Sequence, residues 1–490
     1  MQNTLFDSLQ KLSKSDDFKQ KIVRTKCSII HLSYFQSIIN NEQLHHDLLP
    51  FFQTFNSNIQ NVQDLRTLIP IQDLKMSSTL DEITECLMKG YIFIQLDNNL
   101  NEGVLVNIKD QESGARKYNN TENEYSVVGP KVGFVEDIDT NLNLVRRIIM
   151  SDKLTFEELT VGSLSKTRVA IAYIDGIASP QHVNTLRQRL SEFDFDVIFD
   201  SALIDQIITD NSNSIFPQFM TSERADRIKY GLISGQVAIF CNGSPYVLFG
   251  PSTIFDFFIS PEDYYLPWIL GSFFRLIRYF GVIFSVMATP IYVAVLTFHY
   301  SVIPKNLLGR IIESRVDVPF LPVVEVLFLE ITIELLREAG ARLPSKVGQT
   351  LGIVGGIVIG QAAVSAALTS NILLIFVSLS ALASFTTPIY KMSNTIRFLR
   401  FPLIGLAAIW GGLGIVMGLV IILGHLLRLQ SLGTPYLVPI YPFRYKDFRD
   451  SFIRSSTEYT YLRPGYLRPV TMKRYNVRPQ KDNPNNYDNE

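Results

Sequence analysis

The pattern of apolar and polar positions divides the chain at about residue 260. Before that point, short apolar runs alternate with polar turns, as where Tyr91–Leu96 is followed by Asp97–Asn99. After it come apolar blocks of bilayer length, and the longest, residues 351–390, has no charged side chain. A helix crosses a bilayer in about 20 apolar residues. This block therefore predicts two membrane-spanning helices in a hairpin, with the turn at the polar step Thr369–Asn371.

The first 258 residues predict globular structure. Residues 1–80 are rather polar, and we expect a helical N-terminal segment there. Short β-rich runs then alternate with helical patterns, which predicts two α/β subdomains over 81–160 and 161–258. Ser179 and Pro180 suit the N-cap and first turn of a helix, and Asn242–Gly243 is a hairpin signal. The fold class expected is an α/β cytoplasmic N-terminal domain of two subdomains, followed by an α-helical transmembrane domain.

The predicted transmembrane helical domain covers 259–430, with about four to five spans. The spans are Tyr279–Phe298, the two halves of 351–390, Pro402–Gly424 and, if it crosses, Leu321–Ala339. Cations stand both before and after Pro402–Gly424, and each group favours the cytoplasmic side. One full span between them cannot satisfy both. We favour four full spans, which leave the basic tail 431–490 inside, and we expect that tail to be weakly ordered.

Three rows of residues in this domain are candidate functional positions. Leu321–Ala339 carries an acidic stripe that must meet water, a pore or another polar face, unless the helix lies in the interface. Glycines four residues apart predict a helix-packing face, and a neighbouring polar row is the candidate pore lining. The stripe is Glu330, Glu334 and Glu338, the packing row is Gly352, Gly356 and Gly360, and the pore row is Ile357, Gln361, Ser365 and Thr369.

The net charge and the absence of known catalytic motifs argue against several classes of function. The formal net charge is −1, which gives no support to nucleic acid as a partner. The three cysteines, Cys27, Cys86 and Cys241, match no metal or redox spacing, and we expect them to be reduced. No phosphate-binding loop, nucleophile elbow or zinc-binding motif is present. We therefore expect no enzyme activity, no metal and no cofactor. The first 21 residues also lack the apolar core of a signal peptide.

Several long motifs resemble one family. They are GPKVGFVEDIDTNLNLVRRII (129–149), YIDGIASP (173–180), ISPEDYY (259–265), LTFHYSVIP (296–304), VPFLPVVEVLFLEITIELLREAGARLP (318–344) and IVGGIVIGQAAVSAAL (353–368). The chain resembles the GerA family of spore germination proteins, specifically the A subunit of nutrient germinant receptors, from about residue 80 to 443. Stage V sporulation protein AF shares this architecture and is the nearest alternative.

The resemblance implies a multi-pass protein of the spore inner membrane, with its N-terminal domain in the cytoplasm. It implies a transporter-like B subunit and a lipoprotein C subunit as partners, together with the lipid bilayer. It also implies a homo-oligomeric ring that acts as a ligand-gated ion channel and releases cations to start germination. The alternatives are an accessory spore-membrane channel of the stage V sporulation AF type, or a transporter or scaffold subunit without its own pore.

Overall fold

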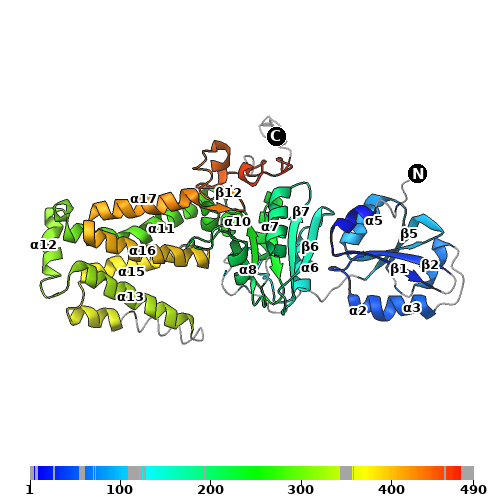
Figure 1. Cartoon of the computed structure of the whole chain (residues 1–490), viewed down its shortest axis with the longest axis horizontal. Helices are drawn as coiled ribbons and strands as arrows, with labels where there is room; N and C mark the ends of the chain where they lie inside the picture. Colours follow the sequence, from blue (N-terminus) through cyan, green and yellow to red (C-terminus); the bar gives the residue numbers. More distant parts are fainter. Residues whose placement is uncertain are drawn as a thin grey trace, which may run out of the picture.

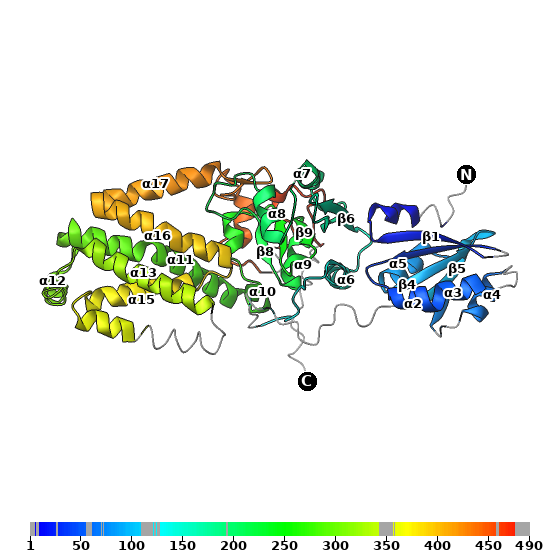
Figure 2. The same ribbon diagram turned by 60° about the horizontal axis from the view of Figure 1, so that its bottom comes forward.

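The protein, described here as a computed structural model, has three parts arranged in a row (Figure 1). A first unit of strands and helices lies at one end, a second lies in the middle, and a helical bundle lies at the other end (Figures 1 and 2). Two local predictions are confirmed in the second unit. Asn242–Gly243 lies at the turn of a β-hairpin, and Pro180 is the first residue of a helix. The structure describes residues 5, 9–25, 28–54, 61–69, 71, 73–108, 121, 124, 128–192, 195–342, 356, 358–456 and 460–475.

The first unit is built on a five-stranded sheet of order β1-β2-β4-β5-β3, with every pair antiparallel. The prediction of a helical segment over residues 1–80 is therefore wrong. Strand β2 is buried along almost its whole length, because it pairs with β1 on one side and β4 on the other. The strands are β1 (Phe18–Arg24), β2 (Ile29–Phe35), β3 (Leu74–Ser77), β4 (Tyr91–Leu96) and β5 (Asn99–Asn107).

Helices cover both faces of this sheet, which gives a three-layered unit. One apolar cluster includes Leu48 and Leu65, and the other includes Ile83 and Leu87. Strand β4 is buried at all its positions because both its faces are covered. The helices are α2 (Asn41–Gln43), α3 (Leu49–Thr54), α4 (Val62–Leu68) and α5 (Leu80–Met88).

The second unit repeats the plan with a five-stranded antiparallel sheet of order β6-β7-β9-β10-β8. Its apolar clusters place α6 and α9 on one face and α7 and α8 on the other. The predicted boundary between the two subdomains at residue 160 is wrong, because α6 and β6, which precede or span that residue, belong to the second unit. The elements are α6 (Ile138–Ile148), β6 (Leu154–Val161), β7 (Thr167–Ile174), α7 (Pro180–Glu192), α8 (Ser201–Ile208), β8 (Met220–Ser222), α9 (Ala225–Ser234), β9 (Val237–Cys241) and β10 (Val247–Gly250).

A buried arginine joins the two units. The Arg146 guanidinium on α6 donates to both carboxylate oxygens of Asp17, at 2.7 and 2.9 Å, and both side chains are at most 3% exposed. The same guanidinium lies over the rings of Phe35 and Phe156. Since the pair is enclosed by aromatic rings from both units, it fixes how the first unit sits on the second.

The helical part begins with a short helix and an elbow. Helix α10 (Glu262–Tyr265) has two acidic residues in its first turn and ends before Pro267, and α11 (Trp268–Thr297) follows it. Among the described residues, α11 is the one helix long and apolar enough to span a membrane by length and composition. The other helices are α12 (Lys305–Glu313), α13 (Pro322–Ala341), α15 (Asn371–Ser384), α16 (Tyr390–Trp410) and α17 (Gly412–Arg428), and residues 358–365 are also helical.

Two of the predicted helical boundaries can be compared directly. The turn of the 351–390 hairpin is confirmed, since Ser370 caps α15 by accepting from the Leu373 amide at 3.2 Å. The single span Pro402–Gly424 is wrong. Gly411 adopts φ +61° and ψ −134°, and the chain turns back there, so α16 and α17 lie side by side (Figures 1 and 2). Gly414 permits the close crossing, because an added Cβ would lie 2.0 Å from the Leu406 oxygen.

This hairpin also removes the conflict over the tail. Since α16 leaves the second unit and α17 returns to it, the cations before and after the hairpin lie at the same end of the bundle (Figure 1). The expectation of a weakly ordered tail is wrong for residues 430–456 and 460–475, which pack on the rest of the protein. In the tail, β11 (Gln430–Ser431) and β12 (Thr434–Pro435) pair, Tyr436 and Leu467 are fully buried, and the Val470 amide donates to the Ile177 oxygen at 3.0 Å. Residues 476–490 lie outside the described part.

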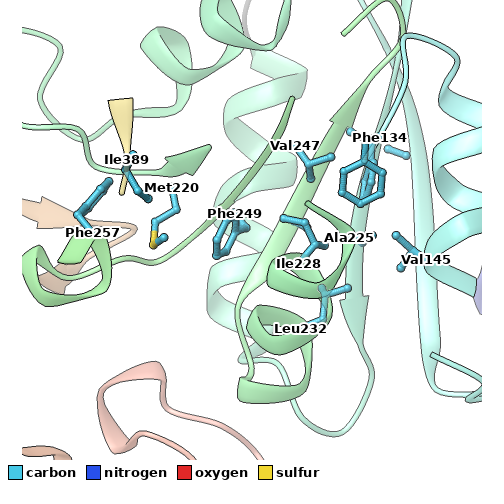
Figure 3. Close-up of a cluster of buried hydrophobic side chains, with 14 of the residues drawn as sticks. Phe134, Val145, Met220, Ala225, Ile228, Leu232, Val247, Phe249, Phe257 and Ile389 are labelled. Carbon is cyan, nitrogen blue, oxygen red and sulfur yellow. The ribbon is translucent and has the colours of Figure 1, made fainter. Parts of the chain in front are cut away.

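One apolar cluster runs from the second unit into the base of the bundle. Figure 3 shows Phe134, Ile228 and Phe249 of the second unit in the same cluster as Ile389, which immediately precedes α16. Met392 and Ile396 on α16 and Leu426 on α17 belong to it as well. A shared core of this kind resists independent motion of the two parts, because separating them would expose apolar surface to water.

Candidate functional site

The otherwise apolar bundle encloses charged side chains at three levels along α13. At the middle level, Glu330 Oε2 accepts from Arg400 Nη1 of α16 at 2.5 Å, and the side chains are 1% and 2% exposed. The second guanidinium nitrogen, Nη2, donates to Ser285 Oγ of α11 at 2.8 Å. Three helices therefore meet at one buried ion pair.

The next level lies one helical turn nearer the second unit. Glu334 Oε2 accepts from Arg397 Nη1 of α16 at 2.9 Å, and Glu334 Oε1 lies 3.5 Å from Arg337 Nη1. Arg337 also donates to Ser384 Oγ of α15 at 3.3 Å, and its guanidinium lies 4.4 Å from the centre of the Phe385 ring. The two arginines thus share one carboxylate, and this level carries a net positive charge.

The third level lies toward the far end of the bundle. Glu325 is fully buried and accepts from the Ser370 amide at 2.6 Å and from Thr369 Oγ1 at 3.2 Å. Its other oxygen, Oε2, lies 3.4 Å from Arg315 Nη2, on the segment between α12 and α13. Tyr292 of α11 shares a hydrogen bond with Ser370 at 3.2 Å. The carboxylate therefore ties α13 to the turn of the predicted hairpin.

These three levels, which we call the charge ladder, are costly to bury. Each ion loses several kcal/mol of hydration, and only close pairing offsets that cost. Within the described part of the chain, Glu330 Oε1 and Arg400 Nε have no hydrogen-bond partner. Ionisable groups buried in an otherwise apolar helical bundle are rare, and they make the ladder a candidate functional site. The ladder fixes how α11, α13 and α16 pack, because its ion pairs and hydrogen bonds join side chains of these three helices.

A second cluster of charges sits at the elbow where α10 meets α11. Arg275 is fully buried, and its Nε donates to Asp263 Oδ2 at 3.1 Å. Its Nη1 donates to Asp450 of the tail, to the backbone oxygen at 2.6 Å and to Oδ1 at 3.0 Å. Asp450 Oδ2 also accepts from the Tyr264 hydroxyl at 2.6 Å. Burial, and then the Asp450 carboxylate, raise the pKa of Tyr264 well above its usual value, so the phenol stays a donor.

The tail forms a strap across this elbow. Arg454 donates to the backbone oxygens of Asp263 at 2.6 Å and Tyr264 at 3.2 Å, and also to that of Leu266, which caps the end of α10. Further along, Arg463 Nε donates to the Ile233 oxygen of the second unit at 2.8 Å. The strap, which we define as residues 445–456 and 460–474, thus holds both the second unit and the start of α11.

The second unit also holds α16 and α17 directly. Lys391 Nζ, in the first turn of α16, donates to Asp205 Oδ2 of α8 at 2.6 Å. Burial raises the pKa of Asp205, and the Lys391 ammonium opposes that rise. Thr395 Oγ1 donates to the Ile215 oxygen at 2.7 Å, and His425 shares a hydrogen bond with Ser214 at 2.9 Å. Any shift of the second unit therefore acts on α11, α16 and α17 together.

The acidic stripe predicted from the sequence meets another polar face, one of the three environments expected for it. Glu330 and Glu334 point to arginines of α16, whereas Glu338 is exposed and pairs with Arg342 on its own helix at 2.6 Å. The stripe thus splits into a fully buried member, Glu330, a partly buried member, Glu334, and a surface member, Glu338. Fully buried Glu325, outside the predicted stripe, is the third acid of the ladder.

The structure describes only some residues of the glycine packing row and of the candidate pore row. Gly352 and Ile357 lie outside the described residues. Gly356 is exposed with open space at its Cβ position, and Gly360 packs on Leu374 of the same chain. In the pore row, Gln361 and Ser365 are exposed but Thr369 is buried against Glu325.

Sequence reasoning missed the basic half of the ladder and the elbow. It placed Arg397 and Arg400 at the membrane edge, because their partners are 63 and 70 residues away. A signal was available: the two arginines are three residues apart in an apolar helix, and Glu330 and Glu334 are four apart in another. Two helices with matching charge spacing predict a paired interface.

Comparison with known proteins places this architecture in context. The model of a family described as "Bacillus/Clostridium GerA spore germination protein" matches residues 7–466. The chain is 48% identical over 475 residues to spore germination protein GerQA of Bacillus cereus, covering 96% of this chain and 94% of that protein. It is 44% identical over 474 residues to spore germination protein GerIA of Bacillus cereus, covering 96% of this chain and 70% of that protein.

A solved structure is also similar to part of the chain. It is the N-terminal domain of the A subunit of the Bacillus megaterium spore germinant receptor GerK3. The similarity covers 50% of this chain and 92% of that domain, at 24% identity and a TM-score of 0.38.

Proposed function

The chain belongs to the Bacillus/Clostridium GerA family of spore germination proteins, and on that basis we propose that it is the membrane-embedded A subunit of a nutrient germinant receptor. It resides in the spore inner membrane, with both α/β units and the tail on the cytoplasmic side. It works with a transporter-like B subunit and a lipoprotein C subunit. One observation supports the membrane assignment most: the bundle is apolar outside and pairs its charges inside, as membrane helices must.

We further propose that copies of the chain form a ring that conducts cations. Gln361 and Ser365 are exposed on the single chain, so they are free to line a path between subunits. Gly356 is exposed with open space at its Cβ position, which suits close approach of a neighbouring helix. The charge ladder lies within one subunit and couples α13 to α16. It is the internal contact through which the cytoplasmic units reach that path.

Potassium release by spores tests the proposed function. In spores whose only germinant receptor contains this chain, we expect nutrient to trigger rapid release. Spores without the chain should retain their potassium. We propose that Ile357, which lies outside the described residues, closes the path as an apolar constriction. Ile357→Ser should then leak potassium without nutrient, and Ile357→Trp should block release while the protein still accumulates. Normal release in the absence of the chain would refute the receptor assignment. Wild-type behaviour of both Ile357 variants would remove this helix from the pore.

A further inference from the structure

An apolar groove lies where α16, α17 and a loop of the second unit meet. Its volume is about 400 Å³. The loop contributes Ile215 and Phe216, α16 contributes Leu399 and Leu403, and α17 contributes Ile422. The polar groups that line it, Asn213 and His425, lie on the loop and in the last turns of α17. The groove is thus apolar along its length and polar at the end nearest the second unit.

Two local features set the shape of the groove. Gly418 lets α17 cross close to α16, since an added Cβ would lie 2.5 Å from Leu403 Cδ2. The His425 ring is fixed by its hydrogen bond to Ser214 and by stacking on Phe216, with ring centres 5.9 Å apart. Ile215 is 44% exposed although it belongs to a polar loop. This loop therefore presents an apolar side chain at the level where the second unit meets the bundle.

Two cations lie beyond the polar end of the groove, although none of the described residues that line it is an arginine or a lysine. Arg428 is exposed three residues beyond His425 on α17, and so lies on the same side of the helix. Lys391 also lies at this end, where it is paired with Asp205. Outside the groove, α17 exposes an apolar face that includes Val416, Val420 and Leu423. An occupant that is apolar over most of its length and negatively charged at the end near Arg428 fits this arrangement.

We propose that this groove binds one anionic phospholipid from the leaflet that faces the α/β units. An acyl chain lies between α16 and α17, and the phosphate lies at Asn213, His425 and Arg428. Basic pockets between membrane helices on the cytoplasmic side suit anionic headgroups. The bound lipid bridges the second unit and the hairpin, at the same junction as the Asp205–Lys391 pair. This inference rests on the membrane location in the proposed function.

The test is the count of phospholipids that stay bound to the full chain, purified from membranes and measured by native mass spectrometry. The wild type should retain phosphatidylglycerol in preference to phosphatidylcholine. Ile421→Trp, which fills the groove from its edge, should lose this lipid. Val420→Trp, on the neighbouring exposed position outside the groove, should keep it. Arg428→Gln should weaken phosphatidylglycerol binding about fivefold, whereas Arg310→Gln, on α12 at the other end of the bundle, should not.

Three results would contradict lipid binding in this groove. Equal loss of lipid from Ile421→Trp and Val420→Trp, or equal retention of the two phospholipids, would overturn the inference. So would loss of self-association by Ile421→Trp with its lipid retained, because a second copy of the chain would then occupy the groove. An alkaline wash of the membranes is done first. A chain that washes off refutes the membrane location itself, whereas a chain that stays without lipid refutes only the groove.

Discussion

Replacing Glu330 by glutamine is expected to destabilise the bundle by about 3–5 kcal/mol, because it leaves a buried guanidinium without its carboxylate. The Glu330 and Arg400 side chains are 1% and 2% exposed, and the pair is joined at 2.5 Å. Arg400→Gln should cost a similar amount for the converse reason. The double variant should lose less than the sum of the two, since neither charge then remains buried and unpaired.

The measurement is thermal unfolding of the purified full chain in detergent, followed by tryptophan fluorescence from Trp268 and Trp410. Glu338→Gln is the matched control. Its partner is also an arginine, but the side chains of Glu338 and Arg342 are 64% and 79% exposed. An exposed pair of this kind contributes about 0–1 kcal/mol. If Glu330→Gln and Glu338→Gln unfold at the same temperature, the ladder does not hold the bundle together.

Asp450→Ala is expected to release the strap from the elbow at a cost of about 1.5–3 kcal/mol, the range for hydrogen bonds to charged groups. The Asp450 side chain accepts from Arg275, Tyr264 and Tyr230. Without it, the Arg275 side chain keeps Asp263 and the backbone oxygen of residue 450 as partners. We expect faster amide hydrogen exchange both in the strap and in residues 262–278.

Asp447→Ala provides the comparison for this prediction. Asp447 lies in the same turn of the strap, but its carboxylate accepts from the Gly465 amide at 2.8 Å, a contact within the strap. Exchange should therefore rise in the strap alone. If Asp450→Ala leaves exchange in 262–278 unchanged, the strap does not stabilise the start of α11, and the α8–α16 contact carries the coupling instead.

Local sequence signals predicted what depends on neighbouring residues. The polar step at Ser370 marked the hairpin turn because the capping hydroxyl acts three residues away. Pro180 and Asn242–Gly243 marked a helix start and a strand turn for similarly local reasons. Strand β1 was missed because, in the described part of the chain, it is an edge strand that pairs with β2 alone and has few buried positions. Strand β2 was missed, because it lies between β1 and β4, and β4 comes about 60 residues later in the chain. Strand pairing over such distances is not encoded in a local period.

The sequence predicted the acidic residues of the charge ladder but not the basic ones. The acids on α13 stood out because charges in an apolar helix are rare. The cations on α16 did not, since they stand next to a charge-free run that suggested a single span. Hydropathy cannot detect the reversal at Gly411, because the residues on both sides of it are apolar. A glycine within such a run has the same hydropathy whether the helix continues or the chain turns back. Once the chain turns there, Arg400 lies within the bundle rather than at its edge.

We propose above all that the α/β units and the tail share one side of a membrane and that α12 lies on the other. Cysteines placed at single exposed positions, in a chain whose native cysteines are replaced, test it by labelling with a membrane-impermeant maleimide. Lys305→Cys, at the start of α12, should react in intact cells. Asp81→Cys in the first unit and Lys446→Cys in the strap should react only after the cells are opened. Labelling of Lys446→Cys in intact cells, or protection of Lys305→Cys there, would contradict the arrangement.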